Sequence, residues 1–426
     1  MIDVYILNTN FEVVGVIDTY ESFIWTDRWN SYGDFELYTS FDYYLIQLCQ
    51  QNYYVHINQS KHTMIIEGIE VETDSEMGIK LRITGRSLES ILDRRIVWTK
   101  QTVGANTKFQ TAIKNIIDRA FGTSNVTPQP GGTVGNARKM TNLIFEWTND
   151  SYIDGILVEK TEYTGDNVYD IITKMCQEAN NTIGWKITLD SENHFVFKLY
   201  SGKDRSYQQD GYKKTADSKL YANKQYYTYD KTTKVYTPLA ISDHDRAKTT
   251  NVDYYEEDPI VPFVIFSPDF DNIINTDYLD STEGMKNVTL VAGEENQETQ
   301  TRVSLIVGSA EDLERRELFT DARDLRLSDY EDNMSRYKRA LKARGINSLV
   351  ENGRMQSYEG QVEATRQFVF GEDFEMGDIV QISNEYGING AVRVIEWVMS
   401  DSTSGTEVYP TFDAVQIIDD TEYEEE

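Results

Sequence analysis

The stretch HTMIIEGIEVETDSEMGIKLRITGRS, residues 62–87, contains two runs rich in β-branched and apolar residues, with turn-forming residues between them. Such runs are typical of neighbouring strands. Similar short runs come before it, separated by Asn, Gly, Ser and Asp: VYILNTNFEVVGVID (4–18), DFELYTS (34–40) and YYVHINQS (53–60). Residues 1–100 are therefore predicted to form a small β-barrel-like domain or curled sheet.

A short helix is predicted directly after the second run. In the segment SLESILDRRI, Ser87 is a suitable N-cap, and Leu88, Ile91 and Leu92 share one helical face. This helix would close the N-terminal β unit and lead the chain into a region of different composition.

That next region changes its hydrophobic period. Between residues 109 and 121 apolar residues recur at steps of three and four, as an amphipathic helix requires. A second helix is predicted in DNVYDIITKMCQEANN, with Asn167 as its cap, followed by the alternating strands TIGWKITLD and HFVFKLYSG. Both helices should pack on that sheet, so residues 101–205 are predicted to form an α+β domain.

Four further segments complete the predicted organisation. A capping box of Ser328 and Glu331 predicts one long helix that ends near Gly345. The fold class is α+β and mainly β, with two β-barrel-like domains linked by α+β elements. The segments are an inserted Tyr/Lys-rich β module at 206–258, strands plus the long helix continuing the α+β region at 259–361, a second β-barrel-like domain at 362–418, and an acidic tail at 419–426.

The composition describes a folded, strongly acidic protein. Of 426 residues, 71 are acidic and 41 basic, giving a net charge of −30, and such a surface repels the phosphate backbone of nucleic acids. Cys49 and Cys176 are the only cysteines and lie far apart, so we expect two buried thiols rather than a disulfide or a zinc site. No stretch approaches the roughly 18 apolar residues of a membrane span.

Four aspartates, Asp269, Asp271, Asp277 and Asp280, lie close together and raise the question of a metal or catalytic site. An EF-hand needs Gly at its sixth position, but counting from Asp269 that position is Ile274. A catalytic carboxylate pair stays open, because spacing in sequence does not fix spacing in the fold. The simpler interpretation, which we favour, makes Pro268, Asp269, Asn272 and Asp277 turn and cap residues of a loop that follows the strand FVIFS.

Other signals of chemistry are weak. The four histidines are not accompanied by a nucleophile-elbow pattern, and no phosphate-binding loop of the P-loop type occurs, so no cofactor is predicted. His56 and His62 flank a predicted turn, and we expect them to face solvent rather than to bind a metal ion.

Five phrases in fixed order resemble the siphophage tail-hub family, which is similar to contractile-phage baseplate hub proteins and to the N-terminal structural region of tail-associated lysins. The resemblance covers about residues 1–205 and 260–418. It implies a homotrimeric ring at the tail tip that continues the tail tube, lets DNA pass without specific binding, and contacts the distal tail protein, the tape measure protein and other tail-tip proteins. The phrases are ITGRSLESILDRRI, VIFSPDFDNIINTDY, KNVTLVAGE, VGSAEDLERRE and FVFGEDFEMGDIVQI.

The resemblance also implies roles for residues. Arg315, Arg316 and Glu317 would be interface ion-pair candidates, although a solvated helix face explains the two arginines equally well. Gly371 and Gly377 would form a tight turn with positive φ. Tail-associated lysins continue into an enzyme domain, whereas this chain ends within about ten residues of its last predicted strand, so we expect no enzyme. The rival functions are a cell-wall-degrading enzyme that uses the four aspartates and a host-surface adhesion module.

The adhesion hypothesis rests on residues 211–236, which carry six lysines against Asp217 and Asp230 in a chain of net charge −30. This segment interrupts the family pattern and is predicted to be a β-hairpin module on the outside of the ring. A self-packed decoration is the simpler interpretation. The candidate host or partner contacts are Tyr212, Lys213, Lys214, Tyr221, Tyr226, Tyr227 and Tyr229.

Overall fold

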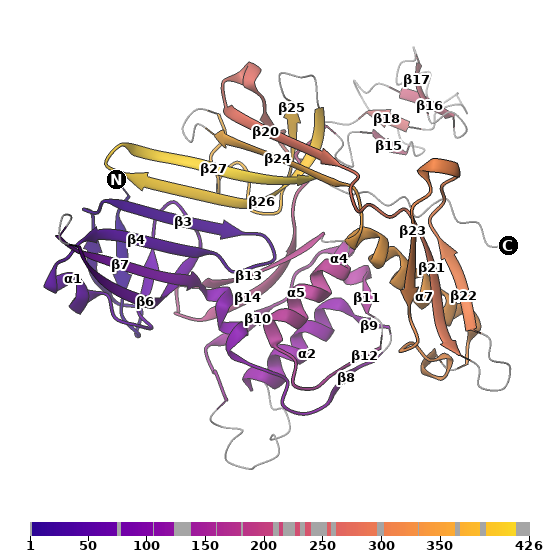
Figure 1. Cartoon of the computed structure of the whole chain (residues 1–426), viewed down its shortest axis with the longest axis horizontal. Coiled ribbons are helices and arrows are strands. Elements are labelled where there is room, and N and C mark those ends of the chain that lie inside the picture. Colours follow the sequence, from indigo (N-terminus) through magenta and orange to yellow (C-terminus); the bar gives the residue numbers. More distant parts are fainter. Residues whose placement is uncertain are drawn as a thin grey trace.

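One large sheet extends through the molecule, with a smaller α+β unit and a three-stranded sheet with its own helix beside it (Figure 1). The predicted class, α+β and mainly β, is confirmed. The computed structural model describes residues 2–74, 78–104, 106–122, 138–158, 160–179, 182–207, 213–215, 226–230, 235–239, 254–256, 261–295, 302–330, 332–362, 367–383 and 389–414.

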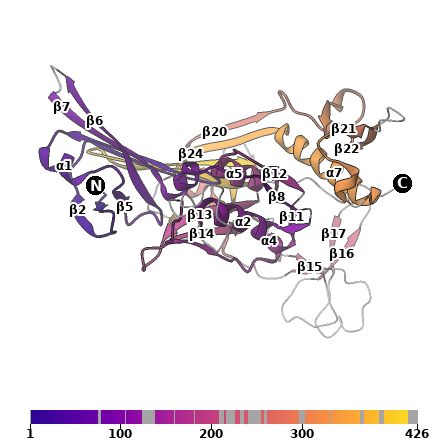
Figure 2. The same cartoon turned by 90° about the horizontal axis from the view of Figure 1, so that it is seen from below.

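The large sheet combines strands from both ends of the chain. In spatial order these are β2 (Val13–Ile17), β1 (Val4–Leu7), β5 (Tyr54–His56), β6 (Thr63–Asp74), β7 (Gly78–Ser87), β4 (Asp34–Ser40), β3 (Ser22–Arg28), β26 (Asn389–Ser402), β27 (Gly405–Ala414), β24 (Met355–Val362) and β20 (Ile273–Ser281). β25 (Ile379–Ser383) pairs with β26, and β19 (Ile265–Phe266) pairs with β25. The two predicted runs of residues 62–87 form the β6–β7 hairpin, which extends beyond the neighbouring strands (Figure 2).

The N-terminal and C-terminal strands meet at β3 and β26. These strands pair antiparallel from Arg28 opposite Glu396 to Ser22 opposite Ser402. A single apolar core lies against both parts and includes Trp25 and Phe412. Residues 1–100 and 362–418 therefore share a sheet and a core, while the exact domain boundaries stay predictions.

The α+β unit follows the sequence closely. α2 (Phe109–Phe121) and α5 (Val168–Glu178) are the two predicted helices, and the side chain of Asn167 accepts a hydrogen bond from the Tyr169 N–H, 2.8 Å. Both pack on the sheet of β13 (Ile183–Leu189), β14 (Phe195–Ser201) and β10 (Leu143–Glu146). The small elements are α4 (Ser151–Gly155), β8 (Gln101–Val103), β9 (Thr107–Lys108), β11 (Leu157–Val158) and β12 (Thr161–Tyr163).

The helix predicted after residue 87 is a 3₁₀ helix, η1 (Leu88–Arg94). Its apolar residues are buried as expected, but the Ser87 side chain does not cap it. The Ser87 hydroxyl instead accepts a hydrogen bond from the Gly33 N–H, 2.8 Å. The capping prediction was wrong because this hydroxyl joins two parts of the chain far apart in sequence.

A separate unit is formed by the residues between β20 and β24 in the sequence. Its sheet has the order β22 (Arg302–Val307), β21 (Val288–Glu295), β23 (Glu317–Asp321), and α7 (Met334–Glu351) packs on one face. The long helix begins later than predicted and continues past Gly345. Gly345 does not end the helix but allows it to pack closely on the sheet, because a Cβ there would come within 2.6 Å of the Val291 side chain.

Four strands of the Tyr/Lys-rich segment form another sheet, in the order β15 (Lys213–Thr215), β18 (Tyr254–Glu256), β16 (Tyr226–Asp230), β17 (Val235–Leu239). β16 and β17 pair antiparallel, which confirms the predicted hairpin. The remaining short elements are α1 (Tyr43–Leu48), η2 (Pro268–Phe270), η3 (Asp312–Glu314) and η4 (Leu327–Tyr330).

Candidate functional site

The large sheet buries one face and presents charged side chains on the other. Along β4, Phe35 and Leu37 point into the core, while Asp34 and Glu36 alternate with them. The pairing of β4 with β7 places Arg86 opposite Asp34 on the same outward face. Strand alternation thus produces a surface, here named the polar face, that can contact water or a solvated polymer.

Acidic side chains outnumber basic ones on the polar face. Strand register assigns these residues, none of them fully buried, to it: Arg28, Asp34, Glu36, Glu70, Glu72, Lys80, Arg82, Arg86, Asp277, Glu396, Glu407 and Asp413. Glu67 lies at the bulge of β6 and joins this face through its ion pair with Arg86. The cations of the polar face are held in ion pairs within the chain. Arg82 lies 2.6 Å from Glu36 and 3.4 Å from Glu70, and Lys80 pairs with Glu21.

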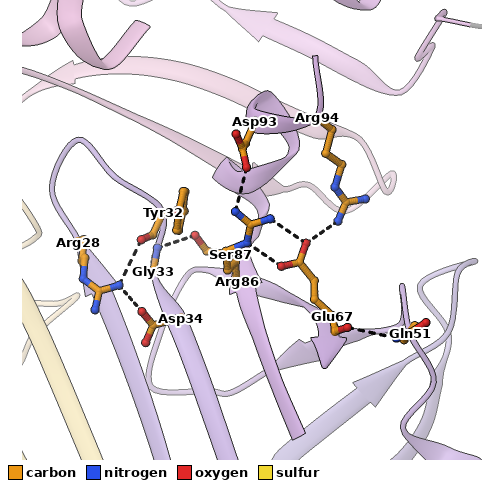
Figure 3. Close-up of polar contacts among 10 residues, drawn as sticks. All are labelled: Arg28, Tyr32, Gly33, Asp34, Gln51, Glu67, Arg86, Ser87, Asp93 and Arg94. Carbon is orange, nitrogen blue, oxygen red and sulfur yellow. Dashed lines mark hydrogen bonds and ion pairs between the residues drawn. The ribbon is translucent and has the colours of Figure 1, made fainter. Parts of the chain in front are cut away.

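Figure 3 shows the densest group, where β6, β7 and η1 meet. Glu67 binds Arg86 at 2.6 Å and Arg94 at 3.0 Å, and Arg86 also contacts Asp93 at 3.1 Å. Partial burial alone raises the pKa of Glu67, but hydrogen bonds and the charges of both arginines outweigh it and lower the pKa below its ordinary value. Glu67 is thus held ionised between two cations.

Arg28 connects three strands at the junction between the N-terminal and C-terminal parts. It pairs with Asp34 of β4 and, at 2.8 Å, with Glu396 of β26 (Figure 3 shows the first pair). The next backbone N–H, that of Trp29, donates to the carbonyl of Ile395 at 2.8 Å. The junction therefore combines backbone pairing with a complementary charge pair.

A charged group also lies in the interior, at the contact between the large sheet and the α+β unit. His62 Nδ1 lies 3.2 Å from Glu89 Oε1, and Glu89 accepts a hydrogen bond from the Ile187 N–H. Burial alone would lower the pKa of His62, but the charges of Asp27 and Glu89 outweigh it and raise the pKa to about 9. The His62 side chain is 16% exposed and lies against Glu89, so the prediction that it faces solvent was wrong.

The described part of the chain offers apolar packing and charged surfaces for contacts with other molecules. No group of three or more His, Cys, Asp or Glu residues in that part is arranged to hold a metal ion. Cys49 and Cys176 are buried free thiols, as predicted, and burial raises the pKa of Cys49 to about 12.

Comparison with known protein families gives a match along nearly the whole chain. A family model described as Siphovirus ReqiPepy6 Gp37-like protein matches residues 3–412. The chain belongs to this family. A comparison with curated proteins found no match.

Two solved structures share the fold of this Gp37-like protein. One is a tail protein from Neisseria meningitidis MC58, with a TM-score of 0.52 and 11% identity, over 97% of this chain and 96% of that chain. The other is the 43 kDa tail protein of prophage MuSo2 from Shewanella oneidensis, with a TM-score of 0.55 and 10% identity, over 97% and 98% of the two chains. At this level of identity the two structures show a fold shared with tail proteins, and the family match places the chain among the siphovirus Gp37-like proteins.

The predicted interface ion pairs of this tail protein are used within the chain. Arg315 Nε lies 2.6 Å from Glu317 Oε1. The Arg316 N–H donates to Asn287 Oδ1 at 2.8 Å, and its guanidinium donates to the carbonyl of Thr282. These contacts brace the connection into β23, and a role between subunits stays a prediction.

The candidate contacts of the Tyr/Lys-rich segment fall largely outside the described side chains. Tyr212 and Tyr221 lie outside the described residues. The backbone places Lys213 and Lys214 on β15, and Tyr226, Tyr227 and Tyr229 on β16. Their role in contacting a host or partner therefore stays a prediction.

The four aspartates divide between a turn and a strand. Asp269 and Asp271 belong to the η2 turn, where the Asn272 side chain bonds the Ser267 N–H and the Ile265 carbonyl, as expected for a shaped loop. Asp277 and Asp280 lie on β20 instead, so the turn assignment was wrong for Asp277. Asp280 pairs with Arg354. Gly371 and Gly377 both have φ of +86°, as predicted.

Sequence reasoning missed the polar face. Its signal was present, because KLRITGR places Lys80, Arg82 and Arg86 at alternate strand positions. Glu21, the partner of Lys80, and Glu36, the partner of Arg82, come from segments that no local pattern could place beside them. Within the described residues, no helix combines the length and the apolar character needed to cross a membrane.

Proposed function

We propose that this phage tail protein is a tail-tip hub subunit, three copies of which form a closed ring that continues the tail tube and lets DNA pass. The observation that carries the proposal is the β3–β26 junction, where two β units of one chain already join edge to edge. At the far end of the same sheet order, β20 is the terminal strand. Within the N-terminal part of the sheet, β5 covers only residues 63–65 of β6, and no described strand lies on that side of residues 68–74.

Such open edges favour assembly. An uncovered strand edge presents backbone donors and acceptors that another chain can pair with. An interface between two different edges is heterologous, and repeating it produces a ring when the rotation closes. Three copies of a two-unit subunit would give a ring of six β units, in which the β20 edge of each copy covers the open part of β6 in the next.

The polar face suits the wall of the channel. Its excess of carboxylates repels the phosphate backbone, and ion pairs such as Arg82–Glu36 keep its cations from binding phosphate. The partners in this proposal are two further copies of the chain, the distal tail protein and the tape measure protein. DNA passes without specific binding.

Light scattering coupled to size-exclusion chromatography, followed by electron microscopy of the purified protein, tests the proposal. We expect a trimer of three-fold ring shape, with each subunit pair burying on the order of 1,200 Å² or more. A monomer at tens of micromolar, both alone and mixed with the distal tail protein, would overturn it.

A further inference from the structure

The large sheet contains the same arrangement of strands twice. In the first unit, the short strand β5 pairs with the start of a long hairpin, β6–β7, and β4 and β3 follow in space. In the second unit, the short strand β25 pairs with the start of the hairpin β26–β27, and β24 and β20 follow. Thus β6 corresponds to β26, and β3 corresponds to β20.

An irregularity in each hairpin strengthens this correspondence. The register of β6 shifts between Ile66 and Gly68, and that of β26 shifts between Val394 and Glu396. In both units the short strand pairs only before the shift, with residues 63–65 or 389–393. A β-bulge bends its strand and ends the regular pairing on that side.

The two hairpins differ after the bulge. Residues 396–402 of β26 pair with β3 of the preceding unit. The corresponding residues 68–74 of β6 pair with β7, and no other strand of the described chain is placed beside them. The first unit therefore has a seven-residue edge at the position where the second unit receives a strand.

We infer that β20 of a second copy pairs antiparallel with residues 68–74 of β6, in the way that β3 pairs with β26. This inference rests on the proposed ring and specifies its interface. The occupant is another copy of this chain because β20 is the only terminal strand that corresponds to β3 in the described sheet.

The internal junction also sets the register. Gly68 corresponds to Glu396, the first residue after each bulge. Asp34 of β4 and Ser357 of β24 occupy equivalent places beside β7 and β27. Thr26 pairs with Asp34, and Leu279 pairs with Ser357. Leu279 therefore corresponds to Thr26. Because Val398 faces Thr26, its equivalent Glu70 faces Leu279 of the next copy.

The same register pairs like charges between copies. Ser400 faces Ile24 within the chain, so their equivalents Glu72 and Asp277 lie opposite each other between copies. The internal junction has the complementary pair Arg28–Glu396 at its first position after the bulge, where the equivalent residues between copies are Ser281 and Gly68, which carry no charge. Directly opposed like charges destabilise a strand pair, so the junction between copies is weaker and more dependent on salt than the internal one.

A cysteine pair tests the register. The variant Glu70→Cys with Leu279→Cys, treated with a short bismaleimide, should give a covalent trimer as its largest product, because each junction links two different positions. The matched control, Glu70→Cys with Ile274→Cys, also uses exposed β20 residues but should not crosslink. The native Cys49 and Cys176 are buried and should not react.

A charge exchange provides an independent test. Asp277→Lys or Glu72→Lys alone should each lower the concentration at which half of the protein is trimeric, by about two- to five-fold per junction. The double variant restores like charges and should lose this gain. A trimer that neither crosslinks through residues 70 and 279 nor shows this pattern would overturn the inferred junction and leave the ring in place. Absence of any trimer would overturn the ring itself.

Discussion

Charge pairs occupy two contrasting environments in this protein. In the interior, Arg205 lies 2.7 Å from Asp378, and both side chains are less than 10% exposed, at 8% and 4%. On the polar face, the Glu67 and Arg86 side chains are each 28% exposed and lie in a larger group. A buried charge that loses its partner is costly, whereas a pair in contact with water contributes little. The interior pair therefore holds distant segments together, and the polar face mainly sets the charge of a surface.

The strongest test of this contrast is Asp378→Ala. Asp378 pairs with Arg205 and also accepts hydrogen bonds from the Lys203 and Glu375 N–H groups. Its removal should lower the free energy of unfolding by about 3–5 kcal/mol, because Arg205 stays buried without a counter-charge. Urea unfolding measures the loss. The control Glu317→Ala removes the exposed partner of Arg315, and an equal loss there would contradict the role assigned to burial.

The interior group around His62 should make stability depend on pH. Because the folded-state pKa of about 9 exceeds the ordinary value of 6.5, this contribution is complete below pH 6.5 and is lost as the pH rises through 9. The loss should amount to about 3 kcal/mol. It should vanish in His62→Gln but persist in His194→Gln, which alters a histidine outside this group. The urea concentrations at the midpoint of unfolding, measured at pH 6.5 and 9, test this prediction. If His62→Gln shows the same dependence of stability on pH as the unaltered protein, His62 is not its cause.

The polar face should respond to substitution weakly and in a salt-dependent way. Glu67→Gln leaves Arg86 and Arg94 in contact with water, so the loss should be about 1 kcal/mol or less. In 1 M salt the screening length is about 3 Å, so the loss of unfolding free energy caused by Glu67→Gln should shrink. The loss caused by Asp378→Ala should stay the same, because that pair is buried. A loss in Glu67→Gln that salt leaves unchanged would show that the polar-face pairs behave like interior ones.

The sequence predicted what local pattern determines. Periodicity located α2 and α5, the alternation of residues 62–87 located the β6–β7 hairpin, and Asn167 was identified as a cap. These features depend on residues within one or two turns of each other. The polar face and the internal junction depend on pairing between residues such as Arg28 and Glu396, which no periodic pattern reveals.

The errors have the same origin. Ser87 was assigned to a local cap, but its hydroxyl bonds Gly33. Glycine is typical of a helix end, but α7 continues through Gly345. The missing Cβ there leaves room for the Val291 side chain. His62 was placed in solvent, but Glu89 binds it in the interior. In each case a tertiary contact replaced the local role that the residue type suggested.

The smallest effect on stability should come from removing the Tyr/Lys-rich segment, and the structure shows where to cut. The Val264 N–H donates to the Arg205 carbonyl at 3.1 Å, and the rings of Tyr207 and Phe263 are 5.0 Å apart, so the chain leaves and re-enters the fold at one place. Deleting only 211–241 would strip β18 of its partners β15 and β16. Replacing residues 208–260 with a short Gly/Ser linker removes the whole sheet instead.

This deletion should change the free energy of unfolding by less than about 0.5 kcal/mol and leave the trimer intact, because closing a shorter loop between adjacent ends costs little entropy. Light scattering and urea unfolding measure both properties, and a variant with lysines 213, 214 and 219 changed to glutamine tests charge alone. If the segment binds host polymer, cell binding should fall in both variants while the trimer persists. Unchanged cell binding would identify a decoration. Loss of the trimer would place the segment within the ring, because only an interface element can abolish assembly while the subunit core stays folded.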